Sequence, residues 1–233
     1  MSGRLIGIGT GPGDPELVTL KAIRLARSAD IVVHLAAKGR ASRARTTMAP
    51  HLEPGVAERA VELDMGFDRS SVEQSYDALA RDLRPELAAG RTVAVLCEGD
   101  PLLFGTFLYV WERLPEAAVE IVPGIASPHA AAAAGRWAIV RGDQAFAVLP
   151  ATMGMAALRS RLALVDAAAI VKVGRHVAAV RHLLAEWGLL DDALLAVQVS
   201  TAAEEVVPLA SFTADVAPYF ALVLTRGLGG QHG

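Results

Sequence analysis

The chain has 233 residues, of which 53% are hydrophobic and 20% charged, with a formal net charge of -3. Such a chain buries a core, and its near-neutral charge gives no basic field for nucleic acid. No apolar stretch reaches the ~20 residues of a membrane span and no signal-peptide pattern is present, so we expect a cytoplasmic protein without a membrane or nucleic-acid partner. Cys97 is the single cysteine, which excludes an internal disulfide and a cysteine-cluster metal site.

The first half alternates short apolar runs with amphipathic stretches. Strands are predicted at residues 4–9, 31–35, 92–97 and 119–122, and helices at residues 16–28, 70–89 and 104–114. Loops rich in glycine and proline separate them. This alternation predicts a doubly wound, mostly parallel sheet flanked by helices.

A polar, charged turn at residues 137–143 interrupts the alternation. Beyond it, strands are predicted at residues 145–150, 168–173, 193–199 and 219–225, and helices at residues 155–164 and 177–187. We therefore expect an N-terminal α/β domain over residues 1–138 and a smaller mixed α/β domain over residues 139–226. The glycine-rich residues 227–233 are predicted to form a frayed tail.

Glycine-containing loops follow three strands of the first half, at residues 11–15, 98–101 and 123–127. Pro12 occupies the third glycine position of a dinucleotide fingerprint, and Asp30 precedes the second strand instead of ending it, so a nicotinamide-dependent oxidoreductase is disfavoured. Each loop alone could be a plain connector. Three of them at the carboxyl ends of parallel strands predict one ligand crevice. A carboxylate at Asp100 and close backbone approach at Gly99 and Gly124 would suit a zwitterionic ligand that carries a nucleoside.

These loops belong to longer motifs that resemble, in order, the signature of the tetrapyrrole methylase family. The matching segments are residues 9–22, 29–32, 98–105, 120–127, 171–176, 200–205 and 219–226. Within the family, residues 42–45, 98–101 and 219–226 are most similar to the branch that methylates carbon 20 of precorrin-2. The resemblance covers the chain nearly end to end.

The resemblance implies a two-domain α/β enzyme that binds S-adenosylmethionine between its halves and forms a homodimer. It implies methylation of precorrin-2 at carbon 20 to give precorrin-3A in cobalamin biosynthesis. The cobalt-loaded substrate of the anaerobic pathway, cobalt-factor II, is the alternative, and the sequence does not separate the two. A tetrapyrrole carrier without catalytic activity is the rival from another class of protein, but it would have no need of three cofactor loops.

Carried over position by position, the resemblance implies a set of cofactor contacts. They are Pro12, Glu98, Gly99, Asp100, Leu103, Ala126, Ser127, Val173 and Ser200. The sequence differs from one group within the family that it resembles. Leu35 stands at about the position where the uroporphyrinogen-methylating members carry an aspartate. A leucine cannot accept a proton or a hydrogen bond, which argues against the uroporphyrinogen reaction.

Other residues could act on a tetrapyrrole substrate. His34, predicted to end the second strand, is a candidate base for the proton that leaves the methylated carbon, although a histidine in such a position is often structural. Arg40, Arg43 and Arg45 cluster in a predicted polar loop, and their guanidinium groups could bind the acetate and propionate carboxylates or form an ordinary solvated surface. The histidines show no metal-ligand spacing, so no intrinsic metal site is expected.

Overall fold

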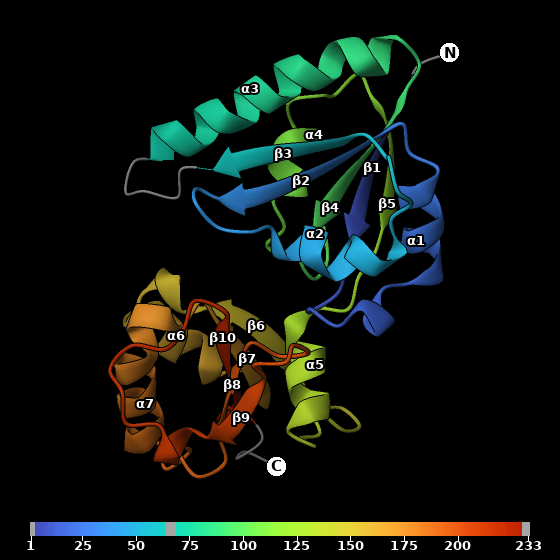
Figure 1. Ribbon diagram of the computed structural model, residues 1–233. Helices are drawn as coiled ribbons and strands as arrows, with labels where there is room; N and C mark the ends of the chain where they lie inside the picture. Colours follow the sequence, from blue (N-terminus) through green and yellow to red (C-terminus); the bar gives the residue numbers. More distant parts are fainter. Residues whose placement is uncertain (1–2, 64–68, 230–233) are drawn as a thin grey trace. The chain divides into compact units, whose positions relative to one another are not determined.

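The computed structural model describes residues 3–63 and 69–229, which fold into two compact units. The units comprise Met1–Ala126 and Ser127–Gly233, and each is described by itself (Figure 1). The division falls before helix α5 (Ser127–Ala134), whereas the sequence placed it after residue 138. The physical reason is packing, because Ala130, Ala131 and Ala132 of this helix pack on the sheet of the second unit.

The first unit is built on a five-stranded sheet in which all the pairings are parallel. Its strands are β1 (Arg4–Gly9), β2 (Ile31–Ala37), β3 (Glu58–Leu63), β4 (Thr92–Cys97) and β5 (Ala118–Val122). The order across the sheet is β3-β2-β4-β1-β5. The predicted doubly wound arrangement is confirmed, and β3 is an edge strand that the sequence analysis missed.

Two helical layers cover this sheet, one on each face (Figure 1). The helix α3 (Arg69–Ala88) and the short helix α4 (Phe107–Trp111) pack on one face, and α1 (Leu20–Arg27) and α2 (Arg43–Met48) pack on the other. Alternate side chains of the central strands fill the two cores. In β1, a Cβ at Gly7 would approach the Phe107 ring to 2.8 Å, so only glycine lets α4 lie this close to the strand.

Two predicted helices are shorter than expected. The segment 16–28 is divided into a 3-10 turn η1 (Pro15–Leu17) and α1, because the Thr19 hydroxyl accepts the Ala22 N–H and starts a new helix there. The segment 104–114 is helical only in α4. Phe104 has a φ of 56°, which is incompatible with a right-handed helix, so the turn after β4 extends to this residue. A second 3-10 turn, η2 (Ala49–His51), follows α2.

The second unit is built on a five-stranded mixed sheet. Its strands are β6 (Phe146–Pro150), β7 (Ala167–Val171), β8 (Leu194–Val197), β9 (Glu205–Pro208) and β10 (Ala221–Arg226), in the order β6-β7-β10-β8-β9. The β6–β7 pair is parallel and the other pairs are antiparallel. Helices α6 (Met155–Leu162) and α7 (Val177–Glu186) pack on one face, and α5 packs on the other. The 3-10 turns are η3 (Ala151–Met153), η4 (Gly174–His176) and η5 (Leu209–Ser211).

The start of the predicted tail is attached to this unit. The Gly227 N–H donates to the Asp166 carbonyl at 2.9 Å, and the Gly229 N–H donates to the Val165 carbonyl at 3.0 Å. Residues 227–229, which the sequence analysis assigned to a frayed tail, are thus hydrogen-bonded to this unit, and residues 230–233 lie outside the described part. Within the described part, no helix combines the length and apolar character that crossing a membrane would need.

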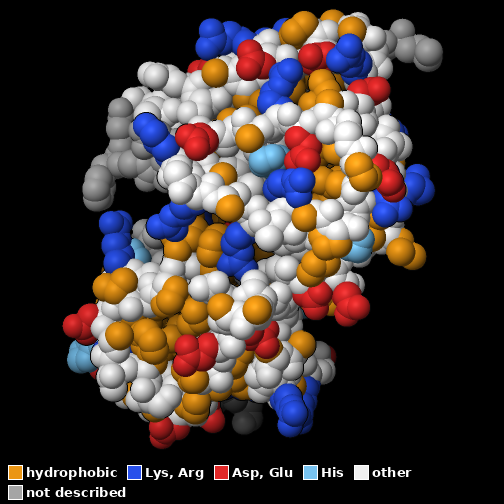
Figure 2. Space-filling view, viewed as in Figure 1, with side chains coloured by type: hydrophobic (Ala, Val, Ile, Leu, Met, Phe, Trp, Pro, Cys, Tyr) orange, Lys and Arg blue, Asp and Glu red, His pale blue; other side chains and the backbone are white. Residues whose placement is uncertain are grey.

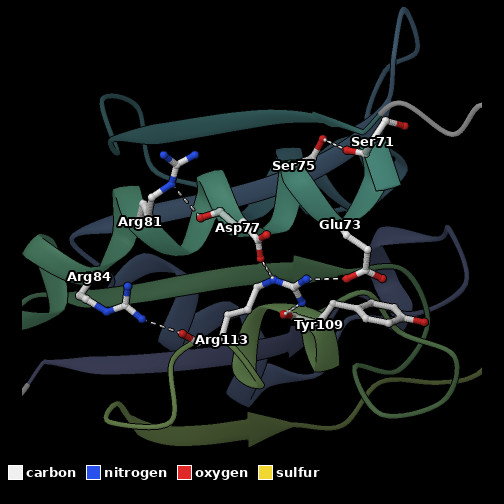
Figure 3. Close-up of polar contacts among 8 residues, drawn as sticks. All are labelled: Ser71, Glu73, Ser75, Asp77, Arg81, Arg84, Tyr109 and Arg113. Atoms are coloured by element: carbon white, nitrogen blue, oxygen red, sulfur yellow. Dashed lines mark hydrogen bonds and ion pairs between the residues drawn. The ribbon is translucent and has the colours of Figure 1, made fainter. Parts of the chain in front are cut away.

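One arginine ties α4 to α3 in the first unit (Figure 3). Arg113, just after α4, donates to the carboxylates of Asp77 and Glu73 on α3, at 2.5 Å in each case. A third N–H bonds the Tyr109 carbonyl at 2.9 Å. The guanidinium also lies 5.6 Å from the centre of the Tyr76 ring, which itself stacks on Tyr109 with ring centres 5.1 Å apart. Burial raises the pKa of Tyr76 to about 12, so this phenol stays neutral and packs as part of the core.

We expect Arg113→Met to lower the free energy of unfolding by about 2 kcal/mol, because three hydrogen bonds of a charged, largely buried group are lost together and two carboxylates are left facing each other. Urea denaturation followed by circular dichroism measures this change. The matched control is Arg81→Met on α3, because exposed Arg81 makes one long bond of 3.4 Å to the Asp77 carbonyl. That variant should stay within about 0.5 kcal/mol of the native protein. Equal losses in the two variants would contradict the structural role of Arg113.

Candidate ligand site at the strand ends

The carboxyl ends of β1 and β4 form a topological switch point. The two strands are neighbours in the sheet. After β1 the chain passes to α1 on one face, and after β4 it passes to α4 on the other. Because the two connections leave in opposite directions, the strand ends between them form the crevice in which open α/β sheets bind ligands.

The loops after β1 and β4 are joined by backbone hydrogen bonds. The Thr10 N–H and the Thr10 hydroxyl both donate to the Cys97 carbonyl, at 2.9 and 3.0 Å. One step further out, Gly11 and Gly99 bond each other in both directions, with N–H to carbonyl distances of 3.2 and 2.8 Å. Both glycines have positive φ, 75° and 63°, so a residue with a side chain would be strained at either position. The first two predicted loops are therefore in direct contact.

The third loop, after β5, joins them through Asp100. One carboxylate oxygen of Asp100 accepts the Gly124 N–H at 3.0 Å, and the other accepts the Leu102 N–H at 2.9 Å. A Cβ on Gly124 would lie 2.0 Å from the Gly99 carbonyl oxygen, and a Cβ on Gly9 would lie 2.5 Å from the Gly124 nitrogen. The three loops thus meet at distances that only glycine allows. Asp100 also has a structural role that the sequence analysis missed, because its carboxylate joins the second loop to the third.

A charged pair lies beside this meeting point. Arg43, the first residue of α2, donates to the Pro12 carbonyl at 3.2 Å and interacts electrostatically with Glu98. Glu98 retains exposed surface, yet loss of water around its carboxylate raises its pKa, and the positive charge of Arg43 opposes that rise. Burial in turn lowers the pKa of Arg43. Positive and negative side chains are also interspersed over the visible face of the first unit (Figure 2).

The structure thus brings together several of the residues expected to contact a cofactor. Pro12, Glu98, Gly99 and Asp100 lie on the joined loops. Leu103 follows in the second loop and is 39% exposed, beside the exposed side chains of Leu102 and Phe104. Ala126 lies in the third loop and ends the first unit, and Ser127 begins α5.

The remaining two expected contacts lie on the second unit, at one edge of its sheet. Both β7 and β8 run antiparallel to β10, so they are parallel to each other and their carboxyl ends share that edge. Val173 follows β7 and is fully buried, and Ser200 follows β8 and donates its N–H to Glu204 at 2.6 Å. Lys172, Gln198 and Ser200 have positive φ, of 57°, 47° and 60°. Strained backbone of this kind concentrates at ligand-binding loops.

His34 is not at the strand end where the sequence analysis placed it. Strand β2 continues to Ala37, so His34 lies in the middle of the strand. Its Nε2 is 3.5 Å from a carboxylate oxygen of Glu58, and its Nδ1 is buried without a hydrogen-bond partner in the part of the chain that the structure describes. Burial lowers the pKa of His34 and Glu58 partly opposes this, so the ring stays neutral at neutral pH.

The three candidate substrate arginines differ in their surroundings. Arg40 is exposed in the loop after β2. Arg43 and Arg45 lie instead on α2, a helix that the sequence analysis took for a loop, although the Ser42 hydroxyl that accepts the Arg45 N–H is a typical helix-start signal. The Arg45 guanidinium binds both carboxylate oxygens of Glu58, at 2.5 and 2.8 Å. Arg40 is therefore the most accessible of the three.

The described residues contain no group of three or more histidine, cysteine or acidic side chains that could hold a metal ion. Cys97 is buried at the end of β4, and burial raises the pKa of its thiol to about 12, so it is not a thiolate nucleophile. The structure therefore does not support catalysis by a thiolate at Cys97.

The lowered pKa of His34 predicts a pH dependence of stability. A histidine with a folded-state pKa below its ordinary value of 6.5 contributes stability that is fully present above pH 6.5 and is lost as the pH falls through the folded-state value. We expect the stability of His34→Gln to fall less than that of the native protein on acidification below pH 6.5. Denaturation midpoints measured at a series of pH values test this, and equal slopes for the two proteins would contradict it.

The chain is similar to known tetrapyrrole methylases. The family model for tetrapyrrole (corrin/porphyrin) methylases matches residues 4–213. A precorrin-2 C(20)-methyltransferase from Sinorhizobium sp is 39% identical over 97% of this chain and 96% of its own length. A cobalt-precorrin-2 C(20)-methyltransferase from Salmonella typhimurium is 32% identical over 88% of this chain and 87% of its own.

A solved structure is similar over the whole length. It is the uroporphyrin-III C-methyl transferase from Thermus thermophilus complexed with S-adenyl homocysteine, which is 25% identical and covers 99% of this chain and 100% of its own, with a TM-score of 0.69. The match of the family model to most of the chain and the full-length similarity to a curated relative lead to one conclusion. This chain belongs to the tetrapyrrole (corrin/porphyrin) methylase family.

Proposed function

We propose that this chain uses S-adenosylmethionine to methylate precorrin-2 at carbon 20, giving precorrin-3A in cobalamin biosynthesis. The observation that carries the proposal is the meeting of three glycine loops at the switch point of the first sheet. It occurs in a chain whose full length matches a protein named as a precorrin-2 C(20)-methyltransferase. The related structure named as a complex with S-adenyl homocysteine supports the choice of methyl donor.

The residues at the strand ends fit a ligand of this kind. Because a Cβ cannot be accommodated at Gly9 or Gly124, the backbone itself forms the surface there. Glu98 supplies a carboxylate for the ammonium group of an amino acid, and exposed Leu103 supplies apolar contact for the nucleoside. We propose that Pro12, Gly99, Asp100 and Ala126 complete the contacts from the first unit. The contacts expected at Ser127, Val173 and Ser200 of the second unit stay predictions.

S-adenosylmethionine supplies the methyl group already activated as a sulfonium, so the protein's main task is alignment. Holding two reactants in one geometry can lower the activation free energy by up to roughly 7–11 kcal/mol. The loops are suited to this task because their backbone is fixed by hydrogen bonds to each other and to the Asp100 carboxylate. We propose that the fixed loop backbone orients the methyl donor toward the acceptor carbon.

We propose that Arg40, Arg43 and Arg45 border the substrate and that Arg40 contributes most to carboxylate binding. Arg40 is exposed, whereas Arg45 is already paired with Glu58 and Arg43 with the Pro12 carbonyl. For the loss of the proton from the methylated carbon, His34 stays the candidate base, because its ring is neutral.

The choice of substrate within the family follows from Leu35. This side chain is 8% exposed and packs in the core between the sheet and α3. A carboxylate at this position, as expected for the uroporphyrinogen reaction, would be buried in an apolar cluster at a high cost. The homodimer and the cytoplasmic location expected from the sequence stay predictions.

We expect the purified protein to transfer one methyl group from S-adenosylmethionine to precorrin-2 and none to uroporphyrinogen. The measurement is mass spectrometry of parallel reactions with metal-free and cobalt-loaded substrate, with nuclear magnetic resonance to locate a labelled methyl. Faster turnover of the cobalt-loaded substrate would assign the anaerobic reaction instead. A methyl on a pyrrole ring carbon, or turnover of uroporphyrinogen, would contradict the assignment to carbon 20.

We expect Asp100→Ala to weaken S-adenosylhomocysteine binding at least tenfold, about 1.4 kcal/mol, because it removes a negative charge and frees the Gly124 and Leu102 N–H groups that hold the loops together. Isothermal titration calorimetry measures the dissociation constant. The matched control is Asp30→Ala, because the Asp30 carboxylate accepts the Thr92 N–H at 2.7 Å at the opposite, amino end of the strands. If Asp30→Ala weakens binding as much as Asp100→Ala does, the effect of Asp100 is not local to the site.

A further inference from the structure

The segment from α2 to η2 binds the backbone of the first loop through three side chains. The contacts are Arg43 Nη2 to the Pro12 carbonyl at 3.2 Å, Thr47 Oγ1 to the Gly13 carbonyl at 3.3 Å and His51 Nε2 to the Pro15 carbonyl at 2.9 Å. Three carbonyls of the first loop therefore accept hydrogen bonds from one neighbouring segment of the chain. Thr47 is only 4% exposed, so its bond is shielded from water.

These bonds fix the directions of two peptide planes. In a trans peptide the carbonyl and the N–H of the next residue point in opposite directions, and the described residues contain no cis peptide. When the Pro12 and Gly13 carbonyls face α2, the N–H groups of Gly13 and Asp14 must face away from it. Neither N–H has a hydrogen-bond partner within the described residues. The loop thus presents two backbone donors with defined directions.

Gly11 is held by its bonds to Gly99, whereas the Pro12 and Gly13 carbonyls are bonded by these side chains. Gly11 and Gly13 both have positive φ, 75° and 149°, and glycine loses more conformational freedom on ordering than any other residue. Pro12 and Pro15 carry no N–H, so they cannot donate a backbone bond that would tether the loop. The three contacts from α2 and η2 therefore supply restraint that the loop sequence lacks.

We propose that Arg43, Thr47 and His51 are positioning residues, which hold the Gly13 and Asp14 N–H groups ready to donate to a carboxylate oxygen of a bound ligand. The inference rests on the proposed function for the identity of the ligands. Both ligands proposed there carry carboxylates, the methyl donor on its amino acid and the tetrapyrrole on its side chains. Measuring the affinity for the methyl donor and the affinity for the tetrapyrrole separately shows which of the two ligands supplies the carboxylate.

Thr47 gives the sharpest test, because its hydroxyl bonds the loop and its side chain is not expected to touch a ligand. Thr47→Val keeps the shape and removes the hydroxyl, and Thr47→Ser keeps the hydroxyl. The matched control is Thr46→Val on the same helix, because the Thr46 hydroxyl bonds the Ser42 carbonyl at 3.0 Å and not the loop. Hydrogen–deuterium exchange of peptides covering residues 10–17 reports on the loop without any ligand.

We expect faster exchange in residues 10–17 for Thr47→Val and native exchange for Thr46→Val and Thr47→Ser. We also expect Thr47→Val to raise either the dissociation constant of S-adenosylhomocysteine or the KM of precorrin-2 by about tenfold, with the other constant and the unfolding midpoint nearly unchanged. The constant that rises identifies the ligand whose carboxylate the loop binds.

Unchanged exchange in Thr47→Val, or equal effects of Thr47→Val and Thr46→Val, would overturn the positioning role. A rise in neither constant despite faster exchange would overturn the donor role of Gly13 and Asp14. A native protein that binds no S-adenosylhomocysteine and methylates no tetrapyrrole would instead refute the proposed function. In that case the exchange measurement would still decide whether α2 holds the loop.

Discussion

The reciprocal backbone hydrogen bonds between Gly11 and Gly99 are the contact on which the first unit's site depends. They form because β1 and β4 are neighbours while their connections leave for opposite faces of the sheet, so that the two loops meet only at their bases. Gly124 of the third loop comes so close to the Gly99 carbonyl that a Cβ would overlap it. The surface offered to a ligand is therefore mostly backbone, and its shape is set by where glycine stands.

The charged side chains near these loops act largely on the protein itself. Asp100 accepts two backbone N–H groups, Arg43 donates to a loop carbonyl, and Arg45 is bound by Glu58. A charged group held in this way adds stiffness to the backbone around it, because each bond is stronger than one between neutral groups. For a reaction in which alignment does most of the work, a stiff backbone is the useful property. Glu98 and Arg40 keep exposed surface.

The second unit shows a related arrangement in a different kind of sheet. Its strands β7 and β8 end at one edge, and the residues just beyond them, Lys172, Gln198 and Ser200, hold positive φ without being glycine. Such conformations cost energy and persist only where the surroundings enforce them. Here the flanking residues Val173 and Val197 are buried in the core that the strands form with α6 and α7.

The sequence by itself determined the class of fold, the positions of the glycine loops and the family. Apolar runs such as residues 4–9 and 92–97 were predicted at their true bounds, because buried parallel strands need continuous apolar sequence whatever their neighbours. Strands β3 and β9 were missed because each lies at a sheet edge, where charged residues such as Glu58 and Glu205 interrupt the apolar pattern of a strand. Helix α2 was missed because its arginines and threonines give little apolar periodicity, although Ser42 marks its start.

Only the tertiary structure decided what the polar residues of the site contact. The sequence presents Asp100 as a carboxylate for a ligand, and the fold shows it also bonded to Gly124 across the gap between two loops. It presents Arg43 as a candidate for binding substrate carboxylates, and the fold places it, with Thr47 and His51, against the first loop. Local sequence encodes propensity and pattern, whereas these bonds join residues 24 to 36 positions apart and exist only once the sheet has brought the segments together.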